Sequence, residues 1–302
     1  NPFLPGDIVW AELIGSSSGA TPAYHDGVAY VATRSGPDGA PAVGTVYAFD
    51  VNASAGLRLL WSVGVGDEFF GGVTYAGGFV YAASYDFDGS DDNSQLVKIR
   101  AADGVLQWIV PCERTSSIPI VCGDRIYLSA GLFGFSSAPK VQAFRDDGTT
   151  AVKLWDTYVD TCGALLVGGW THQPARVGNT LYVGLVPSSG LFGPYTDLFL
   201  LDLTLTPVDA GFVMQQRSGF GSSPALSDGR LYTIGAGGLN ALAAAADFSG
   251  DGLVDGDDVQ GFVDALDAAS PDAQQLALAD LDGDLDVDSD DSALFVQLLL
   301  QP

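Results

Sequence analysis

The sequence predicts a mainly β protein, a five-bladed β-propeller, followed by a small α-helical domain. Two observations support this. A strand–turn–strand pattern ending in tyrosine recurs five times, at spacings of 51, 46, 55 and 50 residues. An Asp-rich stretch of twelve residues then occurs twice, and an apolar helical segment follows each copy. We therefore expect the propeller over residues 1–242, a short linker at 243–246 and the helical domain over 247–302.

Each repeat opens with two strands joined by a glycine turn. The copies are PAYHDGVAYVA, VTYAGGFVYAA, PIVCGDRIYLS, PARVGNTLYVG and PALSDGRLYTI, with tyrosines Tyr30, Tyr81, Tyr127, Tyr182 and Tyr232. A third strand follows in each, and a fourth carries a large apolar anchor, namely Trp61, Trp108, Trp155 and Met214. The alternation and the Gly/Asp turns indicate antiparallel strands.

The fifth repeat has a third strand but no fourth. The chain begins with DIVWAELIG, residues 7–15, which has the pattern of a fourth strand with Trp10 at the anchor position. We therefore expect the N-terminal strand to complete the fifth blade and close the ring, since closure removes open strand edges.

The turn before one anchor carries a family resemblance. The segment KIRAADGVLQW, Lys98–Trp108, resembles the repeat of pyrroloquinoline-quinone-type propellers, with a glycine before the tryptophan of the outer strand. The resemblance covers residues 1–242 and implies the fold. Quinone enzymes of that family usually have eight blades, calcium ligands in the channel and a vicinal cysteine pair, none of which is visible in this sequence. We expect the fold without the quinone cofactor.

The two Asp-rich stretches, Asp247–Asp258 and Asp280–Asp291, are offset by 33 residues. Both place oxygen side chains at loop positions 1, 3, 5, 9 and 12, and position 7 offers a backbone carbonyl. The expected ligands are Asp247, Ser249, Asp251, Leu253, Asp255 and Asp258 in the first loop, and Asp280, Asp282, Asp284, Asp286, Asp288 and Asp291 in the second. Ca²⁺ takes six to eight hard oxygen ligands, so the pattern predicts two calcium ions.

Helical segments follow the loops and align pairwise, and we expect them to share a core: Phe262 with Phe295, Val263 with Val296, Leu266 with Leu299. These loop–helix units resemble a type I dockerin module. The resemblance implies that Gly256, Asp257, Ser289 and Asp290, at loop positions 10 and 11, contact a cohesin partner. Leu285 replaces the usual glycine at position 6 of the second loop, where a sharp turn favours glycine, so we expect a weaker second site.

A third acidic segment, DFDGSDD, spaces Asp86, Asp88, Ser90 and Asp92 at every second residue. It is a candidate for a third calcium ion in a hairpin loop, and a solvated acidic turn is the alternative.

Charge narrows the range of partners. The chain has 37 acidic and 12 basic residues and a net charge of −25. Residues 247–302 contain fifteen Asp and no Lys or Arg. This excess argues against nucleic acid or an anionic membrane as a partner. No apolar run is long enough to insert in a membrane, and the start at Asn1 leads us to expect that a leader has been removed.

Loops that enter the inner strands form the expected mouth of the propeller. They offer a possible ligand site made of Glu68, Phe69, Glu113, Arg114, Trp170, His172 and Phe220. A sugar ligand is one interpretation and ordinary rim residues are the other. The inner strands contain no acid, and glycosidases need a carboxylate pair, so we expect no catalysis.

Three cysteines permit at most one internal disulfide. A Cys112–Cys162 bond is one expectation and unpaired thiols are the other. The whole pattern predicts a secreted or cell-surface, non-catalytic, calcium-binding protein that assembles with a cohesin-like receptor or with a neighbouring copy of itself. The alternative is a carbohydrate-binding or carbohydrate-active propeller that the tail anchors.

Overall fold

The structure, a computed structural model, places most of the chain in regular elements. It describes residues 10–15, 20–35, 43–86, 93–134, 137–185, 196–227, 230–235, 238–243, 245–250, 253–282 and 284–300. The chain divides into two compact units, Asn1–Ser223 and Pro224–Pro302.

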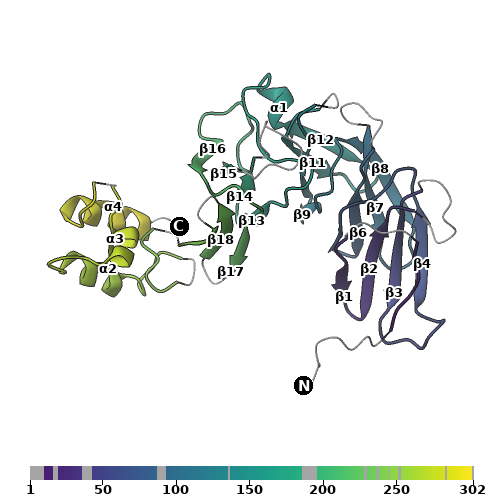
Figure 1. The fold of residues 1–302 in the computed structure, drawn as a ribbon, viewed down its shortest axis with the longest axis horizontal. Helices are drawn as coiled ribbons and strands as arrows, with labels where there is room; N and C mark the ends of the chain where they lie inside the picture. The colour runs from purple at the N-terminus through teal and green to yellow at the C-terminus, as the bar shows by residue number, and fades with distance from the viewer. Residues whose placement is uncertain are drawn as a thin grey trace. The chain divides into compact units, whose positions relative to one another are not determined.

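The first unit consists of four antiparallel sheets with four strands each in the described residues, and each sheet is a run of consecutive strands. The first two sheets contain β1 (Ala23–His25), β2 (Val28–Thr33), β3 (Thr45–Asp50), β4 (Leu59–Gly64), β5 (Val73–Ala76), β6 (Phe79–Ala83), β7 (Ser94–Arg100) and β8 (Leu106–Cys112). The next two contain β9 (Ile120–Cys122), β10 (Arg125–Ala130), β11 (Lys140–Asp146), β12 (Ala151–Asp156), β13 (Ala175–Val177), β14 (Thr180–Gly184), β15 (Asp197–Asp202) and β16 (Val213–Ser218). Successive sheets follow one another around this unit (Figure 1), which confirms the predicted repeat.

The same irregularity occurs in all four sheets, between the third and fourth strands. The register shifts after Ala48, Lys98, Ala143 and Leu200, so that one residue of the outer strand bulges out each time. In the first three sheets the tryptophan anchor of the fourth strand pairs with the third-strand residue just before this shift. In the fourth sheet Gln215 pairs at this place, and Met214 is the bulged residue with 56% of its surface exposed. The expected anchor role of Met214 is therefore wrong, because the bulge turns its side chain outward.

The tryptophan anchors join each sheet to the one that follows. Trp61 Nε1 donates to Ala101 O at 2.8 Å, and Trp108 Nε1 donates to Asp146 Oδ1 at 3.1 Å. Trp155 meets Phe212 edge-on, with ring centroids 5.5 Å apart. Each contact lies at the turn between the third and fourth strands of the next sheet. Gly104 has a φ of +73°, and a Cβ there would lie 2.8 Å from the Trp61 ring, so this turn requires glycine.

The N-terminal segment differs from expectation where it is described. Residues 10–15 form no strand, and residues 7–9 lie outside the described part of the chain. Trp10 lies beside Phe49, and the Arg58 guanidinium stacks over its ring at 4.9 Å. Arg58 also pairs with Glu12 at 3.3 Å. The described N-terminal residues thus contact the first sheet through side chains rather than strand pairing.

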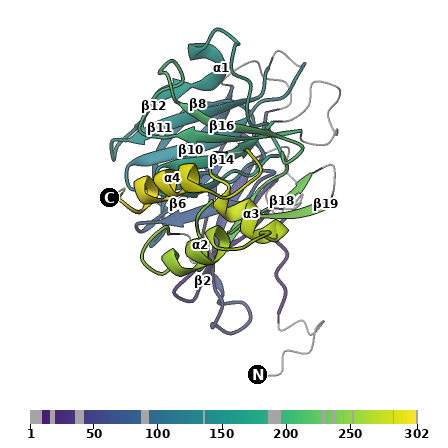
Figure 2. The ribbon, with the colours of Figure 1, turned by 90° about the vertical axis from the view of Figure 1, so that its left-hand side faces the viewer.

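The second unit contains the fifth sheet and three helices. Its sheet has three strands among the described residues, β17 (Ala225–Ser227), β18 (Arg230–Gly235) and β19 (Gly238–Ala243). The helices are α2 (Val259–Leu266), α3 (Ala273–Ala279) and α4 (Ser289–Leu299), and they pack together (Figure 2). One further short helix, α1 (Thr157–Asp160), lies in the first unit. No helix in the described residues is long and apolar enough to cross a bilayer.

Cys122 and Cys162 carry free thiols. Cys112 is buried, whereas Cys122 and Cys162 are exposed. The Cys112–Cys162 disulfide is therefore not formed.

Candidate functional site

The helical tail is organised around one pair of aromatic rings. Phe262 and Phe295 stack with centroids 4.1 Å apart and planes inclined by 5°. They are equivalent positions of the two loop–helix units, so the halves meet through the same residue, as two-fold packing requires. The predicted Phe pair is confirmed, and Leu266 and Leu299 pack against the same core. Val263 and Val296 are 38% and 52% exposed, so their expected core role is wrong.

The first acidic loop is tied together by the carboxylate of Asp258. This buried side chain accepts hydrogen bonds from the backbone N–H of Ser249 at 2.7 Å and of Asp255 at 2.8 Å. Asp247 is also buried and accepts from Gly250 N at 2.7 Å. Position 12 thus connects positions 3 and 9 of the loop. Asp251, at position 5, lies outside the described residues.

The second loop repeats this arrangement 33 residues later. Asp291 is buried and accepts from Asp282 N at 3.2 Å and from Asp288 N at 2.8 Å. The carboxylate groups of the second loop form two sets, and within each set the oxygens lie within 4.8 Å of one another. One set is Asp280, Asp282 and Asp284, and the other is Asp286, Asp288 and Asp291. The structure thus brings the predicted ligands of this loop together in two groups of three, with Asp286 contributing its carboxylate rather than its backbone carbonyl.

Electrostatics favour a cation in these loops. Burial acts to raise the pKa of Asp258, but the hydrogen bonds from Ser249 and Asp255 outweigh it and hold the pKa below its usual value. In the second loop, desolvation and the charges of neighbouring carboxylates raise the pKa of Asp282, and neighbouring carboxylates, Asp284 first, raise that of Asp286. A bound cation would relieve this repulsion. An acidic cluster of oxygen ligands that can hold a metal ion fits the preference of Ca²⁺.

Leu285 adopts the conformation expected to favour glycine. Its φ is +77° and its side chain is 77% exposed. Its N–H donates to Asp280 Oδ2 at 3.1 Å, so the sharp turn forms despite the side chain. For a leucine this left-handed conformation costs about 1–2 kcal/mol.

The four residues expected to contact a partner all lie on the surface of the tail. Gly256 and Asp257 are exposed just before α2, and Ser289 and Asp290 are exposed in the first turn of α4. Asp290 N donates to Asp288 Oδ1 at 2.7 Å, which links this exposed pair to the acidic loop.

The candidate third calcium loop is described only at its start. Asp86 accepts from Asn93 Nδ2 at 2.7 Å, and its N–H donates to Ser94 Oγ at 2.9 Å. Asp88, Ser90 and Asp92 lie outside the described residues.

The residues expected at the propeller mouth separate into buried and partly exposed groups. Phe69, Glu113, Arg114 and His172 are buried. Glu68 pairs with Arg34 at 2.7 Å. Trp170 and Phe220 are only partly buried.

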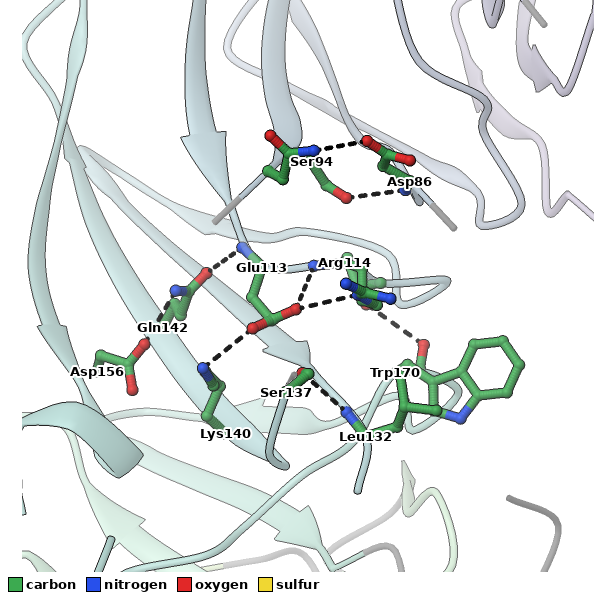
Figure 3. A network of polar contacts seen from close by, with 12 residues as sticks. Asp86, Ser94, Glu113, Arg114, Leu132, Ser137, Lys140, Gln142, Asp156 and Trp170 are labelled. Atoms are coloured by element: carbon green, nitrogen blue, oxygen red, sulfur yellow. Dashed lines mark hydrogen bonds and ion pairs between the residues drawn. The ribbon is translucent and has the colours of Figure 1, made fainter. Parts of the chain in front are cut away.

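Glu113 and Arg114 belong to a polar network (Figure 3). Its other members, Lys140, Gln142 and Asp156, were not predicted from the sequence. Lys140 Nζ lies 3.0 Å from Glu113 Oε2. Gln142 Oε1 accepts from Glu113 N at 2.9 Å, and its Nε2 donates to Asp156 at 3.0 Å. The sequence contains a signal for this network, because Lys140 and Gln142 are polar residues that alternate with the apolar Val141 and Ala143 in β11.

His172 is held in a form unsuited to act as a base. Burial lowers its pKa to about 3. Its Nε2 accepts the backbone N–H of Gly184 at 2.8 Å, so the ring proton resides on Nδ1, which faces Ser223 Oγ at 3.5 Å. A protonated Nδ1 cannot take a proton from Ser223, so this pair is not a nucleophile and base.

Comparison with known proteins agrees with this architecture. Residues 42–193, half of the chain, match the family described as outer membrane protein assembly factor BamB. The structure of BamB from Moraxella catarrhalis is 18% identical, with a TM-score of 0.52 over 78% of this chain and 63% of that one. A europium-containing methanol dehydrogenase is 15% identical, with a TM-score of 0.51 over 79% of this chain and 53% of that one. Quinohemoprotein alcohol dehydrogenase from Comamonas testosteroni is 15% identical, with a TM-score of 0.52 over 76% and 42%.

The chain spans less than two thirds of the length of each of these structures. At such identities the likeness concerns the fold alone, which is a propeller of quinone-type repeats. No curated protein sequence matches the chain. Because the matched segment is half of the 302 residues and coincides with the repeated sheets, this chain belongs to the family described as outer membrane protein assembly factor BamB.

Proposed function

We propose that this protein is a non-catalytic, calcium-binding assembly protein that works at the cell surface or outside the cell. The propeller is its scaffold, and the dockerin-like tail docks a protein partner. The observation that carries the proposal is the paired loop geometry, in which Asp258 and Asp291 hold equivalent positions. The description of the family as an assembly factor is compatible with a role in protein–protein contact.

Calcium would set the shape of the tail's docking surface. Asp258 precedes α2, and Asp291 lies in the first turn of α4, so each loop is continuous with the start of a helix. Two ions in the loops would order these helix starts together with the exposed Gly256–Asp257 and Ser289–Asp290 pairs. The partner is a cohesin-like receptor or a second copy of this chain. Heterologous contacts between copies need not close and would give filaments.

We also propose that the N-terminal strand completes the fifth blade. Each anchor of a fourth strand packs on the turn that follows the third strand of the next sheet. Trp10 packs in the same way on Phe49 and Arg58, at the end of β3, as an anchor from a preceding sheet would do.

The alternative is a carbohydrate-binding or carbohydrate-active propeller anchored by its tail. One observation favours it. Phe70, Tyr85 and Trp170 form a continuous set of rings, with centroids 5.6 Å and 5.2 Å apart, and Phe70 and Trp170 are partly exposed. Sugars bind readily to such aromatic surfaces.

Light scattering and circular dichroism of the full chain, with calcium and with EGTA, test the proposal. We expect calcium to raise the helical signal and EGTA to lower it, and any self-association to follow the same change. Asp258→Asn should reduce the response, whereas Asp267→Asn, an exposed Asp at the end of α2, should not. A helical signal and particle size that ignore calcium would contradict the proposal. Turnover of a polysaccharide would favour the carbohydrate alternative.

A further inference from the structure

A buried guanidinium group lies at the propeller mouth without full pairing. Arg114 follows β8 and is 2% exposed. Among the described residues, its Nε and Nη2 have no hydrogen-bond acceptor. A buried donor that lacks an acceptor is costly, and more so when it is charged. Such a group in a folded protein calls for an explanation.

The neighbouring carboxylate does not satisfy Arg114. Glu113 Oε2 is occupied by Lys140 at 3.0 Å, and Oε1 accepts from the backbone N–H of Arg114 at 3.0 Å. The guanidinium Nε lies 3.4 Å from Oε1, which is an ion pair but not a well-formed hydrogen bond. Arg114 and Lys140 both contact the Glu113 carboxylate, and Arg114 also shares a hydrogen bond with the side chain of Tyr85.

The Trp170 ring lies on the side of Arg114 away from Glu113 (Figure 3). The Arg114 Cζ lies 6.0 Å from the centre of the Tyr85 ring. The centroid of Trp170 is 5.2 Å from that of Tyr85, and Trp170 Nε1 is a second buried donor without an acceptor among the described residues. Since Trp170 is partly exposed overall, it connects the buried group with solvent.

Backbone hydrogen bonds hold these parts in place. Trp170 O accepts from Ser116 N at 2.7 Å, and Trp170 N donates to Gly131 O at 2.8 Å. Gly131 N in turn donates to Arg114 O at 3.0 Å. The segments carrying Arg114 and Trp170 are thereby fixed relative to each other, as a preorganised site requires.

We propose that Arg114 anchors a binding site for a small ring compound bearing a carboxylate. A carboxylate supplies two oxygens that accept hydrogen bonds side by side from the N–H groups of a planar guanidinium. Stacking on the partly exposed Trp170 holds the ring, and Trp170 Nε1 gives one further hydrogen bond. Sugar acids and aromatic acids both have this chemistry. The site is independent of the acidic tail and of the proposed assembly role.

Calorimetric titration of the full chain at fixed ionic strength tests the site. The probes are two acids, galacturonate and benzoate. Each is compared with an uncharged counterpart (its neutral match), which is galactose for galacturonate and benzamide for benzoate. We expect one acid to bind, and its neutral match to bind at least about tenfold more weakly. Binding of galacturonate identifies a sugar acid, and binding of benzoate identifies an aromatic acid. Failure of both acids overturns the proposal.

Variants separate the site from general charge effects. Arg114→Gln should weaken binding by about tenfold or more, and Trp170→Phe, which keeps a ring and removes the donor, by a few fold. Arg125→Gln, at an exposed arginine paired with Asp124, is the matched control and should leave binding unchanged. Should Arg114→Gln fail to fold, Trp170→Phe alone decides. The inference is contradicted if Trp170→Phe binds the acid as tightly as the parent protein does. It is also contradicted if a high-resolution structure shows that only buried water or another part of the chain contacts Arg114 Nη2.

Discussion

Replacing Phe295 by alanine should uncouple the two halves of the acidic tail. The ring is 4% exposed and stacks on Phe262 at 4.1 Å. Removing a buried phenylalanine costs about 3–5 kcal/mol, and a domain of this size seldom has more than about 3–5 kcal/mol of folding stability. The variant tail should therefore be largely unfolded without a metal ion. Calcium binds the folded form, so folding should recover only at higher calcium concentration.

The size of this shift can be estimated. If two ions bind as the tail folds, a loss of about 3 kcal/mol should raise the calcium concentration at the midpoint by about tenfold. The helical signal in circular dichroism reports the change, because α2, α3 and α4 all lie in the second unit and α1 has only four residues. Val296→Ala is the matched control: this adjacent side chain is 52% exposed, and its loss should cost less than about 1 kcal/mol. Identical calcium midpoints for Phe295→Ala and Val296→Ala would refute the reasoning.

Three further predictions concern the loops and the propeller. Asp258→Asn and Asp291→Asn should each reduce the calcium stoichiometry from two to one in calorimetry, because each removes the carboxylate that spans its own loop; two ions bound to either variant would contradict this. Leu285→Gly should relieve the left-handed backbone strain at φ +77° and strengthen calcium binding at the second site by about 1 kcal/mol, or about fivefold in affinity. An unchanged calcium affinity would show that this strain does not weaken the second site. His172 is buried and neutral with a pKa of about 3, so the unfolded chain binds one more proton below its ordinary pKa of about 6.5. The free energy of unfolding should then fall by about 1.4 kcal/mol for each pH unit from about 6.5 towards 3, and His172→Gln should remove that part of the slope in denaturant titrations.

The repeated units of the propeller and the acidic loops could be predicted from the sequence. The strand–turn–strand pattern around Tyr30 and Tyr81 is local, because alternation and turn residues depend on near neighbours along the chain. The acidic loops are local in the same sense, because their oxygen ligands come from alternate residues within twelve consecutive positions. The offset of 33 residues also identified Phe262 and Phe295 as partners, because duplicated units meet through equivalent positions.

Which side chains are buried, and which distant groups come into contact, could not be predicted from the sequence. Val296 is apolar like its neighbour Phe295 yet is 52% exposed, because adjacent residues of an α-helix point in directions about 100° apart. A single bulged residue moved Met214 outward, and sequence periodicity does not reveal a bulge. The contact of Glu113 with Lys140 joins residues 27 positions apart in the chain, and its charges are paired across neighbouring sheets. Such contacts depend on how the sheets pack, and no local pattern contains that information.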